Sequence, residues 1–416
     1  MTGRSEVLFL AHRIPYPPDK GDKIRSWRLL SYLAERYDVH LACFIDDERD
    51  LVHRDFLRGM CKSASFVRLH PKRATIKSAF GLMAGKALSI AYYDHPEMRR
   101  AVAAARARPL AAEIAFSSTM AQYIKEALPG RPRIIDFCDA DSEKWREYAG
   151  LSSQPMRAVY HREAKLLTQE ENAIANWCDV SFAITPAEAI LFNRRPPIRK
   201  EVRWFSNGVD TDYFNPAAAF KPVSSAADIV FTGAMDYRAN VDAVLSFAET
   251  VWPLIRNAEP EARFAIVGAR PDAKIRALDG TAGIIVTGRV EDVRPWLKGA
   301  KAVVAPLLVA RGLQNKVLEA MAMAKPVVAT HAAATGIVCE AGEHLLIADH
   351  PEPLAEAVVS LLHDAAKAER LGAAARALCL ERYQWPQQLH RFGDALNNAI
   401  SSARPAGGPA AILSSA

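Results

Sequence analysis

Short apolar runs alternate with longer segments of helical periodicity along nearly the whole chain. The runs that we predict to be strands in the first half are 6–11, 39–44, 65–69, 113–118, 133–139, 180–185 and 202–205. Those in the second half are 228–235, 263–269, 283–288, 301–307, 326–330 and 344–348. Because the runs are apolar on both faces, they are typical of parallel strands covered by helices on two sides. The pattern predicts an α/β fold with two doubly wound, Rossmann-like domains.

The periodicity is interrupted near the middle of the chain by Asn-Gly, Asn-Pro and a Ser/Ala-rich stretch. This interruption predicts an N-terminal domain over 1–205, a linker over 206–227 and a C-terminal domain over 228–380. Residues 381–400 have the spacing of an amphipathic helix, which we expect to pack back on the first domain. Residues 401–416 are low in complexity and are predicted to be disordered.

The composition is that of a globular protein, with 416 residues, half of them hydrophobic and a quarter charged. No apolar run approaches the ~18 residues of a membrane span, and the N-terminus lacks the pattern of a signal peptide. We therefore expect a cytoplasmic protein. The six cysteines form no C-x-x-C pair and have no histidine cluster nearby, which argues against a zinc site and a disulfide framework.

The net charge of +6 is concentrated in the first half, where 33 Lys and Arg face 25 Asp and Glu up to residue 205. Basic clusters at 70–77, 99–108 and 194–200 could meet an anionic membrane surface or a phosphate-bearing substrate. Solvated faces of helices and loops explain the same clusters. Nucleic acid is not an expected partner, because the clusters lack interleaved aromatic residues and a recognised binding motif.

In parallel sheets ligands bind beyond the carboxyl ends of the strands, so the loops there are the candidate sites. The loop after the first strand, 12–26, contains Lys20, Gly21 and Asp22 beyond three prolines. A glycine before a helix lets the backbone approach a ligand, and the helix start offers free N–H groups. A Pro-rich turn is the alternative. No G-x-G-x-x-G follows this strand, and 81–87 is one residue short of a P-loop.

The loop after the predicted strand 133–139 holds several carboxylates. Asp139 lies nearest the strand end and is our candidate for facing the cleft. Asp139 and Asp141 have a spacing that can hold a divalent cation, but the spacing alone is weak evidence. Asp141 or Ser142 would serve equally as the cap of a helix that begins at Glu143.

Two loops in the second half combine a glycine at a strand end with an arginine. Gly233 is followed by Arg238, and Gly288 by Arg289. Guanidinium groups in such loops are suited to phosphate oxygens. Ordinary surface arginines would give the same pattern.

The segment 310–330 contains the densest set of candidate groups. We predict a loop and then a helix that begins with Asn315 as its N-cap. Free helix N–H groups, Lys316 and Arg311 would form an anion site, while Glu319 supplies two acceptors suited to a diol. A nucleotide offers both partners. The alternative, a surface helix with a Lys316–Glu319 pair, fits poorly because the following residues are apolar.

Several of these segments resemble retaining family-4 glycosyltransferases of the two-domain GT-B fold. The N-terminal segments 8–27 and 136–145 resemble a branch associated with bacterial exopolysaccharide gene clusters. The likeness covers about residues 6–400. The C-terminal segments that carry it are 206–214, 230–244, 264–271, 287–297 and 315–330.

The resemblance implies that the C-terminal domain binds a nucleotide sugar, that the N-terminal domain binds the acceptor, and that the two face each other across a cleft. Glu319 matches the glutamate that holds the ribose hydroxyls. Arg311 stands where the family has a glutamate near the transferred sugar, and Met235 stands where it has an arginine. We therefore hypothesise that Arg311 and Lys316 neutralise the leaving phosphates, and that Asp139 orients the acceptor or the sugar.

We assign further roles on the same basis. Lys20, Gly21 and Asp22 are assigned to the acceptor loop. The donor-binding residues are predicted to be Gly233, Arg238, Gly268, Arg289, Gly312, Gln314, Asn315 and Glu319. No cofactor and no obligatory metal is expected.

The expected reaction is transfer of a sugar from a nucleoside diphosphate with retention of configuration, in exopolysaccharide biosynthesis. The acceptor would be a saccharide or a lipid-linked one, with possible peripheral contact with an anionic membrane. Two alternatives stay open: a nucleotide-sugar epimerase, which converts the donor alone, and a non-catalytic sugar-nucleotide-binding protein.

Overall fold

The computed structural model describes residues 3–83, 85–221, 223, 227–310 and 312–403. The chain forms two compact units. The first comprises the residues up to Phe205 together with those from Leu389 onward, and the second comprises Ser206–Gln388. The chain therefore passes between the units twice, once after Phe205 and once after Gln388.

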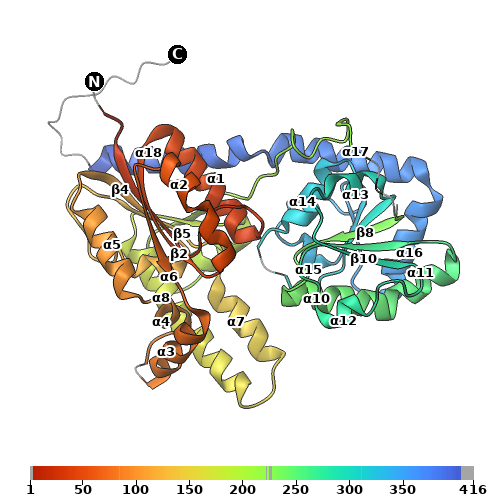
Figure 1. The fold of residues 1–416 in the computed structure, drawn as a ribbon, viewed down its shortest axis with the longest axis horizontal. Helices are drawn as coiled ribbons and strands as arrows, with labels where there is room; N and C mark the ends of the chain where they lie inside the picture. Colours follow the sequence, from red (N-terminus) through yellow and green to blue (C-terminus); the bar gives the residue numbers. More distant parts are fainter. Residues whose placement is uncertain (1–2, 84, 222, 224–226, 311, 404–416) are drawn as a thin grey trace. The chain divides into compact units, whose positions relative to one another are not determined.

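The first unit is built on a parallel sheet of seven strands in the order β3-β2-β1-β4-β5-β6-β7 (Figure 1). The strands are β1 Glu6–Ala11, β2 Asp38–Ile45, β3 Ser63–Arg68, β4 Leu110–Phe116, β5 Arg133–Asp136, β6 Val180–Ala183 and β7 Val202–Trp204. The helices are α1 Gly21–Arg36, η1 Glu48–His53, α2 Arg54–Met60, α3 Pro71–Met83, α4 Leu88–Tyr92, α5 Pro96–Arg106, α6 Ser118–Ala121, α7 Asp141–Gly150, α8 Met156–Trp177 and α9 Pro186–Asn193. Helix α18, Trp385–Ala403, begins in the second unit and ends in the first.

The second unit is built on a parallel sheet of six strands in the order β10-β9-β8-β11-β12-β13. The strands are β8 Ile229–Thr232, β9 Phe264–Val267, β10 Ile284–Gly288, β11 Ala302–Ala305, β12 Val327–Ala329 and β13 Leu346–Ile347. The helical segments are α10 Arg238–Ser246, the π-helical Phe247–Val251, α11 Trp252–Ala258, α12 Ala273–Arg276, α13 Arg294–Gly299, α14 Asn315–Ala322, α15 His331–Ala334, α16 Pro351–His363 and α17 Ala365–Arg382.

Both sheets agree with the sequence-based expectation of doubly wound α/β domains. Each predicted strand overlaps an observed one, and all strand pairs are parallel. The central strands are buried over nearly their whole length, as β1 and β8 illustrate. Burial on both faces explains why their sequences are continuously apolar.

Two sequence-based assignments near the C-terminus differ from the structure. The predicted helix 381–400 is two helices, because α17 ends at Arg382 and α18 begins at Trp385. Residues 401–403, expected to be disordered, form the last turn of α18, where Ala403 packs beside Gly130. The rest of the predicted disordered tail lies outside the described residues.

We expected the segment 206–227 to be an interdomain linker, and its described residues include several that are held on the second unit. Val209 forms a β-bridge with Gln384, and its N–H donates to the Tyr383 carbonyl. The Arg376 guanidinium donates to the Phe214 carbonyl at 3.0 Å. Polar groups of α17 and the residues after it thus satisfy a stretch of irregular backbone, a role that its turn-rich composition does not disclose.

No helix of the described residues is both long and apolar enough to cross a membrane.

Candidate functional site

Two glycines meet where β8 and β9 end in the second unit. Gly233 follows β8 directly, and its N–H donates to the Val267 carbonyl at the end of β9 at 3.0 Å. Gly268 follows β9, and a Cβ added there would lie 1.6 Å from the Gly233 carbonyl oxygen. Only glycine fits at position 268, because any side chain would collide with backbone.

Lys316 of α14 brings a cation to the same place. Its Nζ would lie 3.2 Å from a Cβ added at Gly233. The ammonium group donates to the Asn240 side-chain oxygen and lies 4.5 Å from the centroid of the Phe231 ring. The Asn240 amide donates in turn to the Ala234 carbonyl at 2.9 Å. A glycine-lined strand end, an amide and an ammonium group are thus held together.

Burial perturbs both charged groups at the start of α14. It lowers the pKa of Lys316 to about 7, an effect that the charge of Glu319 partly offsets. It also raises the pKa of Glu319 to about 7, offset in part by Lys316. The Lys316 ammonium is therefore poorly compensated, and an anion bound beside it would restore its charged form.

The start of α14 differs from the prediction. The helix begins at Asn315, and Gln314 occupies the N-cap position without a side-chain capping bond. Asn315 is therefore not the N-cap; its side-chain oxygen instead accepts a hydrogen bond from Asn207 at 2.9 Å. The Asn315 side chain is thus bonded to a residue more than a hundred positions away in the sequence, which no local pattern could reveal. The first N–H groups of α14 still lack intrahelical partners, as at any helix start.

The loop before α14 is only partly described. Arg311, our candidate for neutralising the leaving phosphate, lies outside the described residues. Gly312 has a φ of +64°, which favours glycine, and its carbonyl lies 2.3 Å from where a Cβ at Gly336 would stand. This packing fixes the loop that leads into Gln314.

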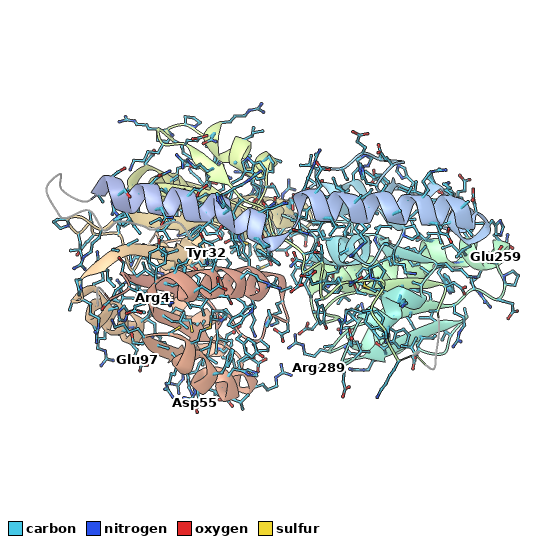
Figure 2. All side chains as sticks on the ribbon, turned by 90° about the horizontal axis from the view of Figure 1, so that it is seen from above. Arg4, Tyr32, Asp55, Glu97, Glu259 and Arg289 are labelled. Atoms are coloured by element: carbon cyan, nitrogen blue, oxygen red, sulfur yellow. The ribbon has the colours of Figure 1, made fainter. Side chains whose placement is uncertain are left out.

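Two predicted donor-binding arginines are not part of the Lys316 cluster. Arg238 is the first residue of α10; its side chain is 64% exposed and forms an ion pair with Asp242 at 3.5 Å. Arg289 lies exposed at the surface of the second unit (Figure 2). Asn240, which sequence reasoning missed, occupies the position beside Lys316. The only sequence signal was a polar residue in the first turn of the helix after β8.

In the first unit, the loop after β1, which we predicted to bind the acceptor, is closed by an ionic cluster. The Arg13 guanidinium donates to Asp22 at 2.7 Å and to Asp46 at 2.9 Å. Burial raises the pKa of Asp22, but the hydrogen bond with His12 and the charge of Arg13 outweigh it and hold that pKa well below its usual range. Asp22 is thus engaged within the protein. Lys20 and Gly21 form the junction with α1, as the N-cap and the first residue of the helix.

His12 has one ring nitrogen in this cluster and one without a partner. Its Nε2 lies 3.2 Å from Asp22, and its ring stacks on Phe116 at 5.6 Å between centroids. The edge of Tyr93 packs against it at 5.8 Å. Nδ1 is buried and makes no hydrogen bond among the described residues. Sequence reasoning included His12 in the loop but did not select it, because a lone histidine has no distinctive spacing.

A buried ion pair holds the helix that carries Asp22. The Arg25 guanidinium donates to Asp136, at the end of β5, at 2.7 and 3.0 Å. It also lies 3.7 Å from the centroid of the Phe205 ring. Both charges are fully buried and satisfy each other, so α1 is tied to the middle of the sheet.

Asp139 lies in the loop that follows β5. Its pKa is raised to about 6, first by burial and then by the neighbouring Asp141. One of its carboxylate oxygens is buried without a hydrogen bond in the described part of the chain. Burial raises the pKa of Asp141, and among the smaller effects His12 lowers it and Asp22 raises it. The segments that follow β1 and β5 therefore lie near each other.

The helix after Asp139 begins two residues earlier than predicted. α7 starts at Asp141 with Ala140 at the N-cap, so neither Asp141 nor Ser142 caps it. The Ser142 N–H and hydroxyl instead donate to the buried Glu171 at 3.0 and 2.6 Å. The described residues contain no group of three or more His, Cys, Asp or Glu that could hold a metal ion.

Comparison with protein families found a match within the second unit. The family model described as glycosyl transferases group 1 matches residues 226–364, which include the Lys316 cluster and Glu319. Residues 226–364 of the second unit are therefore similar to glycosyl transferases group 1. A comparison with curated proteins found no match.

Solved structures share the architecture of the whole chain. Sucrose-phosphate synthase from Thermosynechococcus elongatus has a TM-score of 0.71 at 17% identity, covering 96% of this chain and 100% of that one. HepE from Anabaena, in complex with UDP and glucose, has a TM-score of 0.64 at 15% identity, with coverages of 95% and 100%. TarM from S. aureus, in a complex that includes UDP, has a TM-score of 0.64 at 11% identity, with coverages of 94% and 100%. The chain has the two-domain α/β fold of these structures, the GT-B fold.

Proposed function

We propose that the protein is a glycosyltransferase that moves a sugar from a nucleoside diphosphate to an acceptor with retention of configuration. The observation that carries the proposal is the cluster of Lys316, Asn240 and Gly233 within the segment that matches the group 1 model. The presence of UDP in the HepE and TarM structures supports a nucleotide-sugar donor. We further propose that the acceptor is a saccharide or a lipid-linked one and that the enzyme works in exopolysaccharide biosynthesis, in the cytoplasm.

In this proposal the donor diphosphate lies over Gly233 and the start of α14. Gly268 allows the loops after β8 and β9 to approach closely, and the side chains of Asn240 and Lys316 lie against Gly233, where they would meet the phosphate. Negative charge grows on the phosphate as the bond to the sugar breaks. The Lys316 ammonium and the free N–H groups of α14 stabilise that charge more than they stabilise the intact donor, and this difference accelerates the reaction. Glu319, one turn further along α14, accepts the ribose hydroxyls.

The acceptor is assigned to the first unit. The unpartnered Nδ1 of His12 and carboxylate oxygen of Asp139 are groups that can orient an acceptor hydroxyl. The departing phosphate takes the proton of that hydroxyl, so transfer with retention requires no protein base. In the balanced step, the bond from the sugar to the diphosphate breaks, the bond from the sugar to the acceptor oxygen forms, and the proton leaves with the nucleoside diphosphate.

Arg311 retains its proposed role beside the leaving phosphates. The test compares Arg311→Ala with Arg311→Glu, the residue of the resembling family, by initial transfer rates. A loss of transfer rate in both variants supports this role of Arg311. Wild-type rates in both variants would contradict it.

The donor itself is tested with the full chain and a panel of UDP-, GDP-, ADP- and dTDP-sugars. A donor that binds the folded state must raise the melting temperature of the protein. At a donor concentration of a hundred times the Kd, the free energy of unfolding rises by about 3 kcal/mol. Release of the nucleoside diphosphate on addition of acceptor then establishes transfer. Conversion of the donor sugar without acceptor would instead establish the epimerase alternative, and binding without any turnover the non-catalytic one.

A further inference from the structure

Two helical segments leave the carboxyl edge of the sheet in the first unit. Helix α3 follows β3 and is joined to α4, while α7 follows β5 and forms a hairpin with α8. Figure 1 shows α3, α4 and the α7–α8 hairpin projecting from the sheet on the same side. The loop with His12 follows β1, leads into α1 with Asp22, and leaves the sheet at this same edge, since all these strands are parallel.

These segments are fixed to each other by a buried carboxylate. Glu163 of α8 is fully buried and accepts hydrogen bonds from the N–H groups of Leu88 and Ser89 at 2.5 and 2.8 Å. It therefore caps α4 from the neighbouring helix. Within the hairpin, Trp145 of α7 packs against Tyr160 of α8 at 5.3 Å between ring centroids. The projecting helices therefore pack on one another within the unit.

Two stretches of these segments are strongly basic, whereas α7 carries both signs and the second half of α8 is acidic. Residues 71–92 and 151–165 contain seven Lys and Arg and a single acid, Glu163, whose side chain is buried in the cap of α4. The exposed cations are Lys72, Arg73, Lys77, Lys86, Arg157 and Lys165. Such a concentration of cations attracts a surface that carries many phosphate groups.

Apolar side chains stand at the tip of the hairpin. Leu151 is 65% exposed and Met156 is 44% exposed, at either end of the turn between α7 and α8. Burial of large apolar side chains away from water is favourable, so those at an exposed turn are stabilised when they enter a bilayer interface. Cations beside protruding apolar groups fit an anionic bilayer better than nucleic acid, which would leave the apolar tip in water.

We propose that α3, α4 and the α7–α8 hairpin form a docking surface for an anionic lipid bilayer. Leu151 and Met156 enter the interface, and the exposed cations of these segments contact the lipid phosphates. Docking in this way brings the bilayer to the edge of the sheet where His12 and Asp139 lie. A lipid-linked acceptor would then be taken from the membrane, a consequence that rests on the proposed function.

The test is flotation of the full chain with vesicles of phosphatidylcholine alone or mixed with phosphatidylglycerol, at low and physiological salt. We expect recovery only with the anionic vesicles, falling as salt rises. Reversing Lys72, Arg73 and Lys77 to Glu removes three attractions of about 1 kcal/mol each, so partitioning should fall about 100-fold or more. Leu151→Ser with Met156→Ser should weaken partitioning about tenfold and leave its salt dependence unchanged.

The matched control reverses three exposed cations elsewhere on the same unit, Arg100, Arg108 and Lys125, and should float like the wild type. No recovery of the wild type with anionic vesicles at low salt overturns the proposal. So does an equal loss in the control, or unchanged binding in the Leu151 and Met156 variant, since either outcome reduces the effect to non-specific attraction between polyions.

The donor panel separates this proposal from the proposed function. A donor-induced rise in melting temperature without flotation overturns only the docking surface. Flotation with no response to any donor overturns only the glycosyltransferase.

Discussion

Replacing Lys316 with methionine should weaken donor binding and at the same time stabilise the folded protein. Burial moves the pKa of Lys316 from 10.5 to about 7. A shift of that size makes the charged form about 4–5 kcal/mol less favourable in the folded state than in the unfolded chain. Water that reaches a half-buried site reduces this value, so we expect Lys316→Met to gain about 1–2 kcal/mol near pH 7.

The sign of this effect depends on pH in a defined way. Because the pKa is lowered on folding, the unfolded chain binds a proton that the folded protein releases between pH 7 and 10.5. The destabilisation by Lys316 is therefore full below about pH 7 and disappears as pH rises to 10.5. The gain from Lys316→Met should follow the same course.

Donor binding should change in the opposite direction. A charge-assisted hydrogen bond to a phosphate contributes about 1.5–3 kcal/mol, so loss of the ammonium should raise the Kd about 10- to 150-fold. Melting curves with and without the donor measure both effects, at about 2–4 °C per kcal/mol for a unit of this size. Lys301→Met is the matched control; Lys301 is exposed, pairs with Asp228 and lies at the opposite end of β11. Wild-type donor affinity in Lys316→Met would refute the reasoning, and so would a loss of stability.

Three further predictions concern the same two units. Gly268→Ala should destabilise the second unit by about 2–4 kcal/mol and abolish the donor-induced rise in melting temperature, because the added Cβ would meet the Gly233 carbonyl. The control Gly299→Ala, with open space around it, should be nearly neutral in melting curves. Donor affinity measured by calorimetry should fall about tenfold per pH unit above pH 7 as Lys316 loses its proton, and a flat profile would contradict this. Asp22→Asn should lower the free energy of unfolding by about 1–3 kcal/mol near pH 7 and make stability depend less on pH below pH 4. The lowered pKa of Asp22 contributes stability at pH values above the pKa of the unfolded chain, and this stability is lost on acidification. An unchanged dependence of the melting temperature on acid pH would argue against the ion pair.

The strands could be predicted because a strand buried on both faces leaves an uninterrupted apolar run. Their ends were less accurate. The run 228–235 continues beyond β8, which ends at Thr232, because Gly233 already turns toward β9. Gly233 and Met235 still donate to the Val267 and Ala269 carbonyls, so the apolar run and some cross-strand hydrogen bonds both outlast the regular strand, and hydrophobicity alone overestimates its length.

Long-range partners explain what the sequence did not reveal about the candidate site. Lys316 and Gly233 could be selected from local patterns, since one lies at a helix start and the other at a strand end. Asn240 could not, because its relation to Lys316 depends on how α10 and α14 meet. The misassigned cap at Asn315 has the same cause: a remote amide, Asn207, takes the side chain that local rules assign to the helix.

The most direct test of the account is the melting temperature of the full chain, with and without each nucleotide sugar of the panel, in the wild type and in Lys316→Met. The account predicts that one class of donor raises the melting temperature of the wild type, and that the rise is largely lost in Lys316→Met although that variant is the more stable without ligand. Silence of the wild type across the whole panel, or an equal rise in both proteins, would contradict it.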